Sequence, residues 1–254
     1  MSLDDEAIHA LWDGLAAYGP SRTDQALDYA MAVLADLLDA QQAHWHGAVR
    51  LGSPGDAASG WRSAGVRYLH PQPEYDAAYV EHCRRVDRGL VDPTVAVNLN
   101  GAGAYRVTIQ HETAPSGWYE SEFYRSLIEP FEIRDVMYLA TPLNEDVEGW
   151  LGFKRIGDDK PLFGERERAL LARAGRALKW FHRNVALHHG LLVAEKPLTP
   201  AERRVLQALL QGGSEREIAE KTGLTLSTVH TYATRIYRKF NVKGRAGLTA
   251  LWLG

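Results

Sequence analysis

"LTLSTVHTYATRIYRKF", residues 224–240, decides the fold of the C-terminal part of the chain. Its apolar residues recur every three or four positions, which predicts an amphipathic helix. At about 100° per residue, one arc of this helix holds Leu226, Val229, Ala233, Ile236 and Phe240. The opposite arc holds Ser227, His230, Thr231, Thr234, Arg235 and Arg238. We expect the apolar arc to pack on neighbouring helices and the polar arc to stay free.

The residues before this stretch carry clear signals for the starts and ends of helices. Thr199 and Glu202 form a capping box at the start of one predicted helix, and Ser214 and Glu217 form another. Gly223 can end the second helix and form the tight turn before the quoted stretch. A fourth short helix is predicted near the end of the chain. Short helices with a turn of about three residues before the third are typical of a helix-turn-helix.

The charges of the chain are distributed unevenly. The 254 residues have a net charge of −3, but the segment from Lys196 to the end has ten Lys/Arg and four Glu. That segment therefore carries +6, and the preceding 195 residues carry −3 − 6 = −9. From Thr225 to Arg245 there are five Lys/Arg and no acidic residue, whereas a merely solvated face usually mixes both signs. The pattern predicts an anionic partner for this segment alone.

The polar arc of the quoted helix suits DNA recognition. Short hydrogen-bonding side chains lie in its first half and allow close approach to base edges in the major groove. Arg235 and Arg238 lie in its second half, where cations can contact phosphates and contribute affinity by counterion release.

The segment "LTPAERRVLQALLQGGSEREIAEKTGLTLSTVHTYATRIYRKFNVKGRAGL" resembles the DNA-binding domain of LuxR-type transcriptional regulators. The resemblance implies a DNA-contacting set: Ser227, Thr228, His230, Thr231, Thr234, Arg235, Arg238, Lys239, Lys243 and Arg245. His230, Thr231 and Thr234 would read bases, and the cations would contact the backbone. Many family members carry Lys or Arg where His230 and Thr234 stand. The family also implies dimers that meet through the last helix, here about 245–253, with RNA polymerase as a further candidate partner.

The first 194 residues predict an α+β domain with an antiparallel sheet flanked by helices. "VMYLATPLNEDVEGWLGFKRI" (136–156) has the pattern of a β-hairpin, "YRVTI" (105–109) that of a strand, and 23–40 and 75–86 that of helices. "EFYRSLIEPF" (122–131) predicts a short helix ended by proline. This pattern, with "FGERERALLARAGRALKWFH" after the hairpin, resembles GAF- or PAS-like sensor domains.

Residues 164–193 predict one long helix at the end of this domain. An apolar stripe recurs along it: Leu170, Ala174, Leu178, Phe181, Val185, His188 and Leu192. The stripe fits a core-packing helix, and it also fits a helix that pairs with its copy in a dimer. "EKPLTP" (195–200) ends the helix, so the predicted domains are 1–194 and 195–254.

One segment indicates a ligand-binding site. "YDAAYVEHCRRVDRGLVDP" (75–93) resembles the aromatic-plus-aspartate pattern of acyl-homoserine-lactone receptors, in which the aspartate accepts an amide hydrogen bond. Tyr79 stands where tryptophan is usual, Cys83 where tyrosine is usual, and Val107 where a tryptophan is expected. Tyrosines four apart also fit an ordinary helix core. The candidate ligand-binding residues are Trp45, Trp61, Tyr75, Tyr79, Asp92, Trp118 and Tyr138.

Several classes of protein are disfavoured. "MSLDDEAIHA" lacks the apolar stretch of a secretory signal, and no segment approaches the roughly 18–20 apolar residues of a membrane span. The single cysteine, Cys83, allows no intrachain disulfide and is expected to be a buried or idle thiol. We therefore expect a cytoplasmic protein with no membrane partner. No nucleophile elbow or P-loop is present, so neither an enzyme nor a cofactor is expected.

Four histidines, His44, His46, His188 and His189, could suggest a metal site. No acidic or cysteine partner is spaced to complete it, so no metal is expected, and solvent-exposed or capping roles are favoured.

The leading hypothesis is a transcriptional regulator that binds double-stranded DNA as a homodimer. Its N-terminal domain would sense a small molecule or a partner. One alternative is a non-DNA-binding interaction protein that sequesters a related regulator, which the absence of cations at positions 230 and 234 permits. Another is an acyl-homoserine-lactone-responsive quorum-sensing receptor.

Overall fold

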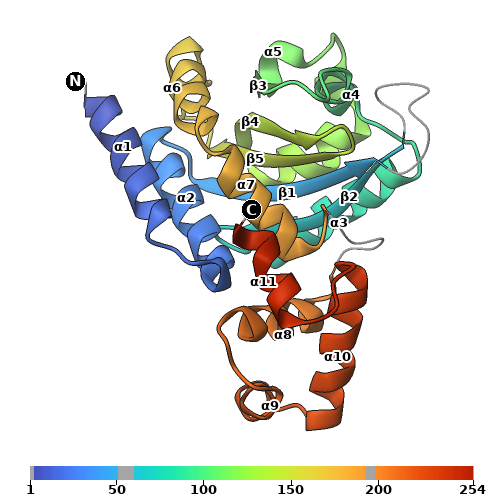
Figure 1. The fold of residues 1–254 in the computed structure, drawn as a ribbon. Helices are drawn as coiled ribbons and strands as arrows, with labels where there is room; N and C mark the ends of the chain where they lie inside the picture. Colours follow the sequence, from blue (N-terminus) through green and yellow to red (C-terminus); the bar gives the residue numbers. More distant parts are fainter. Residues whose placement is uncertain (1–2, 51–59, 193–197, 254) are drawn as a thin grey trace. The chain divides into compact units, whose positions relative to one another are not determined.

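The computed structural model describes residues 3–50, 60–192 and 198–253 of the chain (Figure 1). By its contacts the chain divides into two compact units. The first comprises Met1–Trp12 with Asp28–Lys179, and we call it the sheet unit. The second comprises Asp13–Leu27 with Trp180–Gly254, and we call it the helical unit. The predicted boundary at residues 194 and 195 falls in the segment 193–197, outside the described residues, so it stays a prediction.

The sheet unit is built on a five-stranded antiparallel sheet. Its strands are β1 (Gln42–Arg50), β2 (Trp61–Tyr68), β3 (Arg106–Ile109), β4 (Ile133–Asn144) and β5 (Val147–Ile156), in the spatial order β2-β1-β5-β4-β3. The predicted hairpin is β4–β5, in which Tyr138 pairs with Gly152 and Ala140 with Trp150. The antiparallel sheet and the α+β class are therefore confirmed, while the GAF- or PAS-like type stays a prediction.

Helices precede, interrupt and follow the strands. They are α1 (Leu3–Ala16), α2 (Thr23–Leu37), α3 (Pro73–Asp87), α4 (Pro93–Asn100), α5 (Gln110–Thr113) and α6 (Glu165–Arg176). The helices predicted over 23–40 and 75–86 are confirmed as α2 and α3. The short helix predicted over 122–131 and ended by proline is present, but most of it is not α-helical. A π-helical turn, Tyr124–Ile128, runs there into a 3-10 turn, Glu129–Phe131, because Pro130 cannot donate the next helical hydrogen bond.

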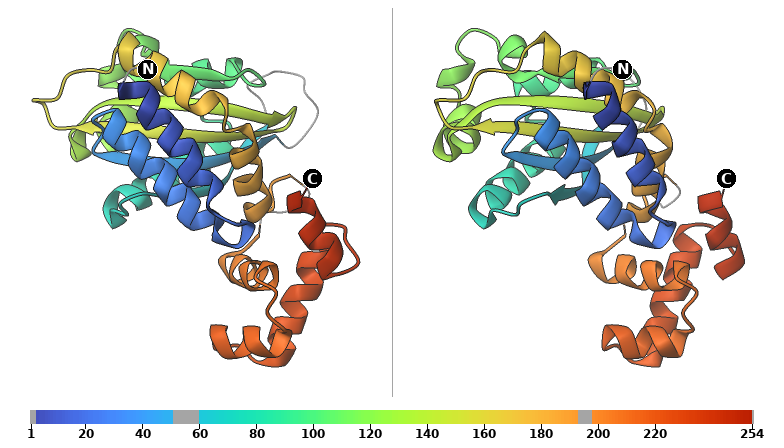
Figure 2. Two further views of the ribbon diagram at one scale, coloured as in Figure 1. Left: turned by 60° about the vertical axis from the view of Figure 1, so that its left-hand side comes forward. Right: turned by 90° about the vertical axis from the view of Figure 1, so that its left-hand side faces the viewer.

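The two faces of the sheet have different neighbours. Consecutive strand residues point to opposite faces, so Leu139 of β4 lies on the face opposite Tyr138. A Cβ on Gly175 of α6 would lie 2.5 Å from the Leu139 side chain, so α6 packs closely on this face. Trp12 of α1 donates from Nε1 to the Ala174 carbonyl at 2.8 Å. The further views in Figure 2 show this helical layer beside the sheet. The other face is left for α3 and α4.

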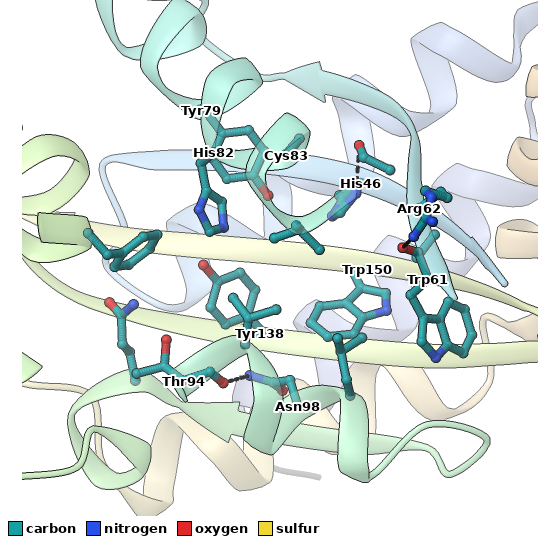
Figure 3. A pocket seen from close by; sticks show the side chains of 17 residues that line it. His46, Trp61, Arg62, Tyr79, His82, Cys83, Thr94, Asn98, Tyr138 and Trp150 are labelled. Carbon is teal, nitrogen blue, oxygen red and sulfur yellow. Dashed lines mark hydrogen bonds between the residues drawn. The ribbon is translucent and has the colours of Figure 1, made fainter. Parts of the chain in front are cut away.

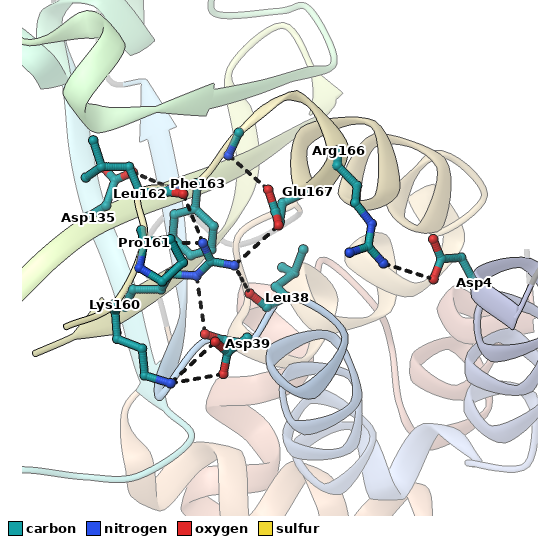
Figure 4. A network of polar contacts seen from close by, with 12 residues as sticks. Asp4, Leu38, Asp39, Asp135, Lys160, Pro161, Leu162, Phe163, Arg166 and Glu167 are labelled. Carbon is teal, nitrogen blue, oxygen red and sulfur yellow. Dashed lines mark hydrogen bonds and ion pairs between the residues drawn. The ribbon is translucent and has the colours of Figure 1, made fainter.

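A buried arginine links α2, β5 and α6 (Figure 4). Arg155 is only 3% exposed, and it donates to the carbonyls of Leu38 at 2.8 Å and Leu162 at 3.0 Å. It also reaches Glu167 Oε1 at 3.4 Å, and the other oxygen of Glu167 accepts from the Gly164 N–H at 2.9 Å. The start of α6 is thus held by a charge with several partners.

The single helix predicted over 164–193 is wrong. Helix α6 ends at Arg176 and α7 begins at Lys179 and ends at His189. The interruption follows Gly175, a residue of low helix propensity that the close contact with Leu139 requires. From Leu170 to His188 the predicted apolar stripe is buried by the chain itself, which favours the core-packing interpretation.

The helical unit contains α7 and the four predicted C-terminal helices: α8 (Pro200–Leu210), α9 (Glu215–Thr222), α10 (Leu226–Lys239) and α11 (Arg245–Leu253). Both predicted capping boxes are present, at Thr199 with Glu202 and at Ser214 with Glu217. Val229, Ala233, Ile236 and Phe240 are buried in one core with α8 and α9. The prediction that Leu226 belongs to the packed apolar arc is wrong. Leu226 is 54% exposed, because the adjoining helices do not cover the first turn of α10.

Candidate functional site

Helices α9 and α10 form the two arms of a helix-turn-helix. Gly223 ends α9 in the left-handed conformation, with φ of 70°, which glycine adopts without strain. Thr225 then caps α10 by accepting a hydrogen bond from the Thr228 N–H at 3.1 Å. The predicted polar arc of α10 is exposed at Ser227, His230, Thr231, Thr234, Arg235 and Arg238. The turn therefore presents a free polar face next to a buried apolar one.

Two predicted base-reading residues already have contacts at the N-terminal end of this face. His230 Nδ1 lies 3.1 Å from Glu215 Oε2 at the start of α9, although 70% of the histidine side chain is exposed. Thr231 Oγ1 donates to the Ser227 carbonyl at 2.9 Å, so its lone pairs remain available to accept. The Glu215 carboxylate beside His230 disfavours close approach of phosphates, and base reading by His230 stays a prediction.

The predicted phosphate-contacting cations fall into two groups. Lys239 Nζ lies 2.8 Å from Glu202 Oε2, whose side chain is only 5% exposed, so this lysine links α10 to α8. Arg245 donates to the carbonyls of Gly212 and Gly213, the residues that follow α8. Arg235, Arg238 and Lys243 are exposed. The first two cations have structural contacts that the sequence did not reveal, and phosphate contact stays a prediction for all five.

A mostly enclosed pocket with a cavity volume of about 60 Å³ lies on the other face of the sheet, between α3 and α4 (Figure 3). Helix α3 contributes Tyr79, His82 and Cys83, and α4 contributes Thr94 and Asn98. The strands contribute His46, Trp61, Tyr138 and Trp150. Its largely apolar lining with a few polar groups is typical of small-molecule sites, while its volume is below the roughly 300–1,000 Å³ usual for them.

The predicted ligand-binding residues separate into those that line this pocket and those that do not. Trp61, Tyr79 and Tyr138 line it. Tyr75 lies in the same buried cluster as Tyr79 but does not line the pocket, and Trp45 lies on the opposite face of β1 from His46.

Asp92 and Trp118 lie behind the pocket wall and bond to each other. The indole Nε1 of Trp118 donates to the two Asp92 oxygens at 3.1 and 3.2 Å. Asp92 Oδ1 also accepts from the Thr94 N–H at 2.8 Å and from the Thr94 hydroxyl at 2.6 Å, and so caps α4. Asp92 Oδ1 therefore has three donors within the protein, whereas Oδ2 has one, which it shares with Oδ1.

The sequence did not single out His82, Gln110 or Phe123 as lining residues, yet all three line the pocket. His82 lies three residues after Tyr79 on α3, so helical spacing could have identified it. No local signal marks Gln110, which follows β3, or Phe123, whose ring makes an edge-to-face contact with His82 with centroids 4.6 Å apart. Long-range packing brings these two into the pocket.

A buried ion pair holds one pocket wall. Glu148 is completely buried, and its oxygens accept from Arg106 at 2.8 and 2.9 Å, the Gly103 N–H at 2.8 Å and Trp150 Nε1 at 2.8 Å. The Arg106 guanidinium also lies over the Trp150 ring, 5.0 Å from its centroid. Glu148 thereby fixes the orientation of Trp150, which lines the pocket.

The histidines on the pocket face are held neutral. Burial lowers the pKa of both His46 and His82 to about 4. His46 Nε2 lies 2.9 Å from the Ser63 hydroxyl. His44, on the same strand face as His46, is also buried, and burial lowers its pKa well below 6.5. The expectation of solvent-exposed or capping histidines is wrong for His44, His188 and His189, which are 1%, 0% and 3% exposed.

A buried lysine lies beside the pocket. Lys154 of β5 is 2% exposed, and its ammonium lies 3.8 Å from the centroid of the Tyr75 ring and 5.9 Å from those of Tyr68 and Tyr79. Among the described residues, none accepts a hydrogen bond from Lys154 Nζ. Burial lowers the pKa of Lys154 to about 7, and the nearby Asp76 opposes this shift.

Within the described ranges, no group of three or more His, Cys, Asp or Glu side chains is placed to hold a metal ion. Cys83 is a free, buried thiol, as expected, and burial raises its pKa to about 11. None of the helices described has the length and apolarity needed to cross a membrane.

Comparisons with known proteins place the C-terminal helices in a family. Residues 196–252 match the bacterial regulatory proteins of the luxR family. The transcriptional regulatory protein MctR of Rhizobium johnstonii is 40% identical over 52 residues, which are 20% of this chain and 24% of that protein. The probable HTH-type transcriptional regulator GfsR of Streptomyces halstedii is 40% identical over 57 residues, 22% of this chain and 24% of that protein. The chain thus spans about a quarter of the length of the curated relatives it matches.

Among solved structures, SdiA in complex with octanoyl-rac-glycerol is similar over 99% of this chain and 95% of that chain. The sequence identity is 13% and the TM-score is 0.49.

Proposed function

We propose that this chain, whose residues 196–252 are a LuxR-type helix-turn-helix domain, is a transcriptional regulator that binds double-stranded DNA as a homodimer. The exposed polar face of α10 is the observation that carries the proposal. Arg235 and Arg238 lie exposed in its second half, beyond the small polar residues of the first half. This division supports contact with bases at one end and with phosphates at the other.

The proposed dimer contact is α11. Ala246, Gly247 and Ala250 are exposed on it, while Leu248 and Trp252 are buried in the helical core. Small exposed residues allow the same helix of a second copy to approach closely. Pairing also increases the number of bases contacted, which one small domain needs for specificity. RNA polymerase is a further proposed partner of the DNA-bound dimer.

The proposed signal is a small molecule in the pocket between α3 and α4. The enclosed, largely apolar lining with a few polar groups supports this proposal, and the pocket lies in the sheet unit, for which we propose a GAF- or PAS-like sensor role. A ligand can change DNA binding only if it binds the DNA-competent and incompetent states with different affinity. The proposed place of action is the bacterial cytoplasm, where the DNA is.

Replacing both Arg235 and Arg238 by alanine is expected to weaken DNA binding at least about tenfold. Two lost phosphate contacts per module should also reduce the slope of log K against log[salt] by about two units per module. The measurement is a titration of a short random-sequence duplex at several salt concentrations, followed by fluorescence anisotropy.

The matched control is Arg88→Ala with Arg166→Ala, which removes the same charge from exposed positions of the sheet unit. If the α10 variant has the same affinity and salt slope as this control, the helix-turn-helix does not bind DNA as proposed.

His230→Ala is expected to reduce sequence discrimination while leaving the salt slope unchanged. The Glu215 contact orients the imidazole and makes phosphate contact unfavourable, so the loss should fall on base reading, at about 1–3 kcal/mol for one preferred base. Binding of the native and variant proteins to a selected site and to scrambled duplexes measures this. Equal weakening of every duplex would contradict a base-reading role.

The second candidate is an interaction protein that sequesters a related regulator. The observation in its favour is the number of cations with partners inside the protein, since Lys239 bonds Glu202 and Arg245 bonds the carbonyls after α8. Co-purification of a related regulator, together with the absence of salt-dependent DNA binding, would favour this candidate.

A further inference from the structure

The ring side chains of the pocket form a wall suited to a planar aromatic body. Trp61 and Trp150 lie at one end, in a cluster with Ala48 and Leu99. Trp150 faces His46 and Tyr138 with ring centroids 6.4 and 6.2 Å apart. A planar ring can make offset or edge-to-face contacts with several of these rings at once.

Three other lining residues carry hydrogen-bonding groups that no described residue uses. Gln110 is 5% exposed and follows Ile109, which pairs with Met137, the neighbour of Tyr138. The side chains of Gln110, Tyr138 and His82 line the pocket, and no described residue forms a hydrogen bond with any of them. Buried amide and hydroxyl groups ordinarily have partners, so these three provide donors and acceptors for a ligand.

The charge of the pocket disfavours an ionised ligand. No carboxylate is among the described residues that line it, and the lining histidines are neutral because they are buried. Arg62 is the one permanent cation among the described lining residues, and its NH1 already donates to the Trp61 carbonyl at 2.8 Å. Burying an unpaired charge is costly, whereas an uncharged polar head can be satisfied by hydrogen bonds.

The acceptor expected for an acyl-lactone amide, Asp92, is not among the residues that line the pocket. Both oxygens of Asp92 accept from Trp118, and Oδ1 also accepts from Thr94. Rings form the larger part of the lining, and the aliphatic side chains among the described lining residues are Ala48, Val86, Val95 and Leu99.

From this arrangement we infer that the pocket binds an uncharged aromatic molecule. Its ring lies at the Trp61–Trp150 end, and its amide- or hydroxyl-type head meets Gln110, Tyr138 and His82. The inference rests on the proposed sensing role of the pocket and names the ligand class for that role. It is independent of DNA contact, because every group involved belongs to the sheet unit.

Cys83 provides a direct measure of pocket occupancy. It is the only cysteine of the chain, and it lines the pocket with 8% of its surface exposed. A bound molecule should slow alkylation of this thiol. The probes are cinnamamide, cinnamate and N-octanoyl homoserine lactone, tested on the full chain without DNA.

Cinnamamide is expected to slow Cys83 alkylation and to raise the Tm of the protein. Cinnamate has nearly the same shape but a negative charge, so the dissociation constant of cinnamamide should be at least about tenfold lower than that of cinnamate. The lactone should protect less than the amide. Stronger protection by cinnamate or by the lactone would overturn the inference, as would no protection by any probe at its solubility limit.

Two variants test the polar head. Gln110→Leu and Tyr138→Phe should each weaken the binding of cinnamamide by up to about tenfold, the effect of losing one hydrogen bond. The affinity for propenylbenzene, which lacks the amide, should change by no more than about twofold. Tyr105→Phe is the matched control, because the Tyr105 hydroxyl donates to the Ala172 carbonyl away from the pocket. Equal loss of both compounds would show a structural role instead.

The two proposals can fail separately. If cinnamamide protects Cys83 but the α10 arginine variant binds DNA like its control, only the DNA-binding proposal is wrong. If DNA binding depends on salt as proposed but no aromatic probe protects Cys83, only the ligand class is wrong.

Discussion

Replacing Lys154 by methionine is expected to raise the free energy of unfolding of the sheet unit by roughly 2–4 kcal/mol at pH 7. Lys154 is 2% exposed, and its pKa falls from 10.5 to about 7 because burial disfavours the ammonium. Methionine keeps the apolar contacts with Tyr75 and removes the group that must lose its water or its proton. Urea unfolding at pH 7, followed by tryptophan fluorescence, measures the change.

The same lysine gives stability a predicted dependence on pH. Between pH 7 and 9 the unfolded lysine stays protonated while the folded one, with a pKa of about 7, loses its proton. The unfolded state then binds more protons, so stability should rise with pH, by about 2 kcal/mol over this range. Lys154→Met should remove that rise.

Lys160→Met is the matched control, because Lys160 contacts Asp39 in a partly exposed ion pair. It should leave the pH dependence unchanged. If the native protein and Lys154→Met depend on pH equally between pH 7 and 9, Lys154 is not buried with a lowered pKa as described.

Glu148→Gln is expected to destabilise the sheet unit by about 3–5 kcal/mol, because it leaves Arg106 buried without its charge partner. Glu148 is completely buried, and the Arg106 side chain is 12% exposed. The amide can accept through only one atom, whereas the carboxylate accepts from Arg106, Gly103 and Trp150. Chemical denaturation at pH 7 measures the loss.

Glu165→Gln is the control for this prediction, since Glu165 pairs with Arg168 on the surface and its side chain is 77% exposed. Its cost should stay below about 1 kcal/mol. A second readout reports on the local structure. Because Glu148 orients Trp150, Glu148→Gln should change the near-ultraviolet circular dichroism of the folded protein. If Glu148→Gln lowers the free energy of unfolding by no more than the control does, the ion pair contributes little to stability.

Local features of the chain were predictable because they depend on near neighbours. The capping boxes at Thr199 and Ser214 and the β4–β5 hairpin are set by residues within a few positions of one another. The break between α6 and α7 was missed for the opposite reason. Gly175 lies in an otherwise continuous helical pattern, and the side chain that requires a glycine there is Leu139 on β4.

The ligand pocket was only partly predictable. Tyr79 was predicted from the resemblance of residues 75–93 to acyl-homoserine-lactone receptors, and Tyr138 as one of several aromatic candidates. Which aromatic residues share a cavity depends on how α3 and α4 pack on the sheet. Trp45 and His46 are adjacent in sequence and lie on opposite faces of β1. Asp92 and Trp118 were both predicted to bind ligand, yet they bond to each other across 26 positions.

The amino-acid sequence by itself determined the helix-turn-helix and the antiparallel hairpin, because caps, turns and hydrophobic periodicity act over a few residues. It also determined which face of α10 is polar. The tertiary structure alone decided which cations remain exposed, since Lys239 meets Glu202 from another helix. It likewise decided that Gln110, Tyr138 and His82 line the pocket and that, among the described residues, the Asp92 carboxylate does not. Such choices depend on contacts between residues far apart in the chain, where a side chain's partner is set by packing and not by spacing.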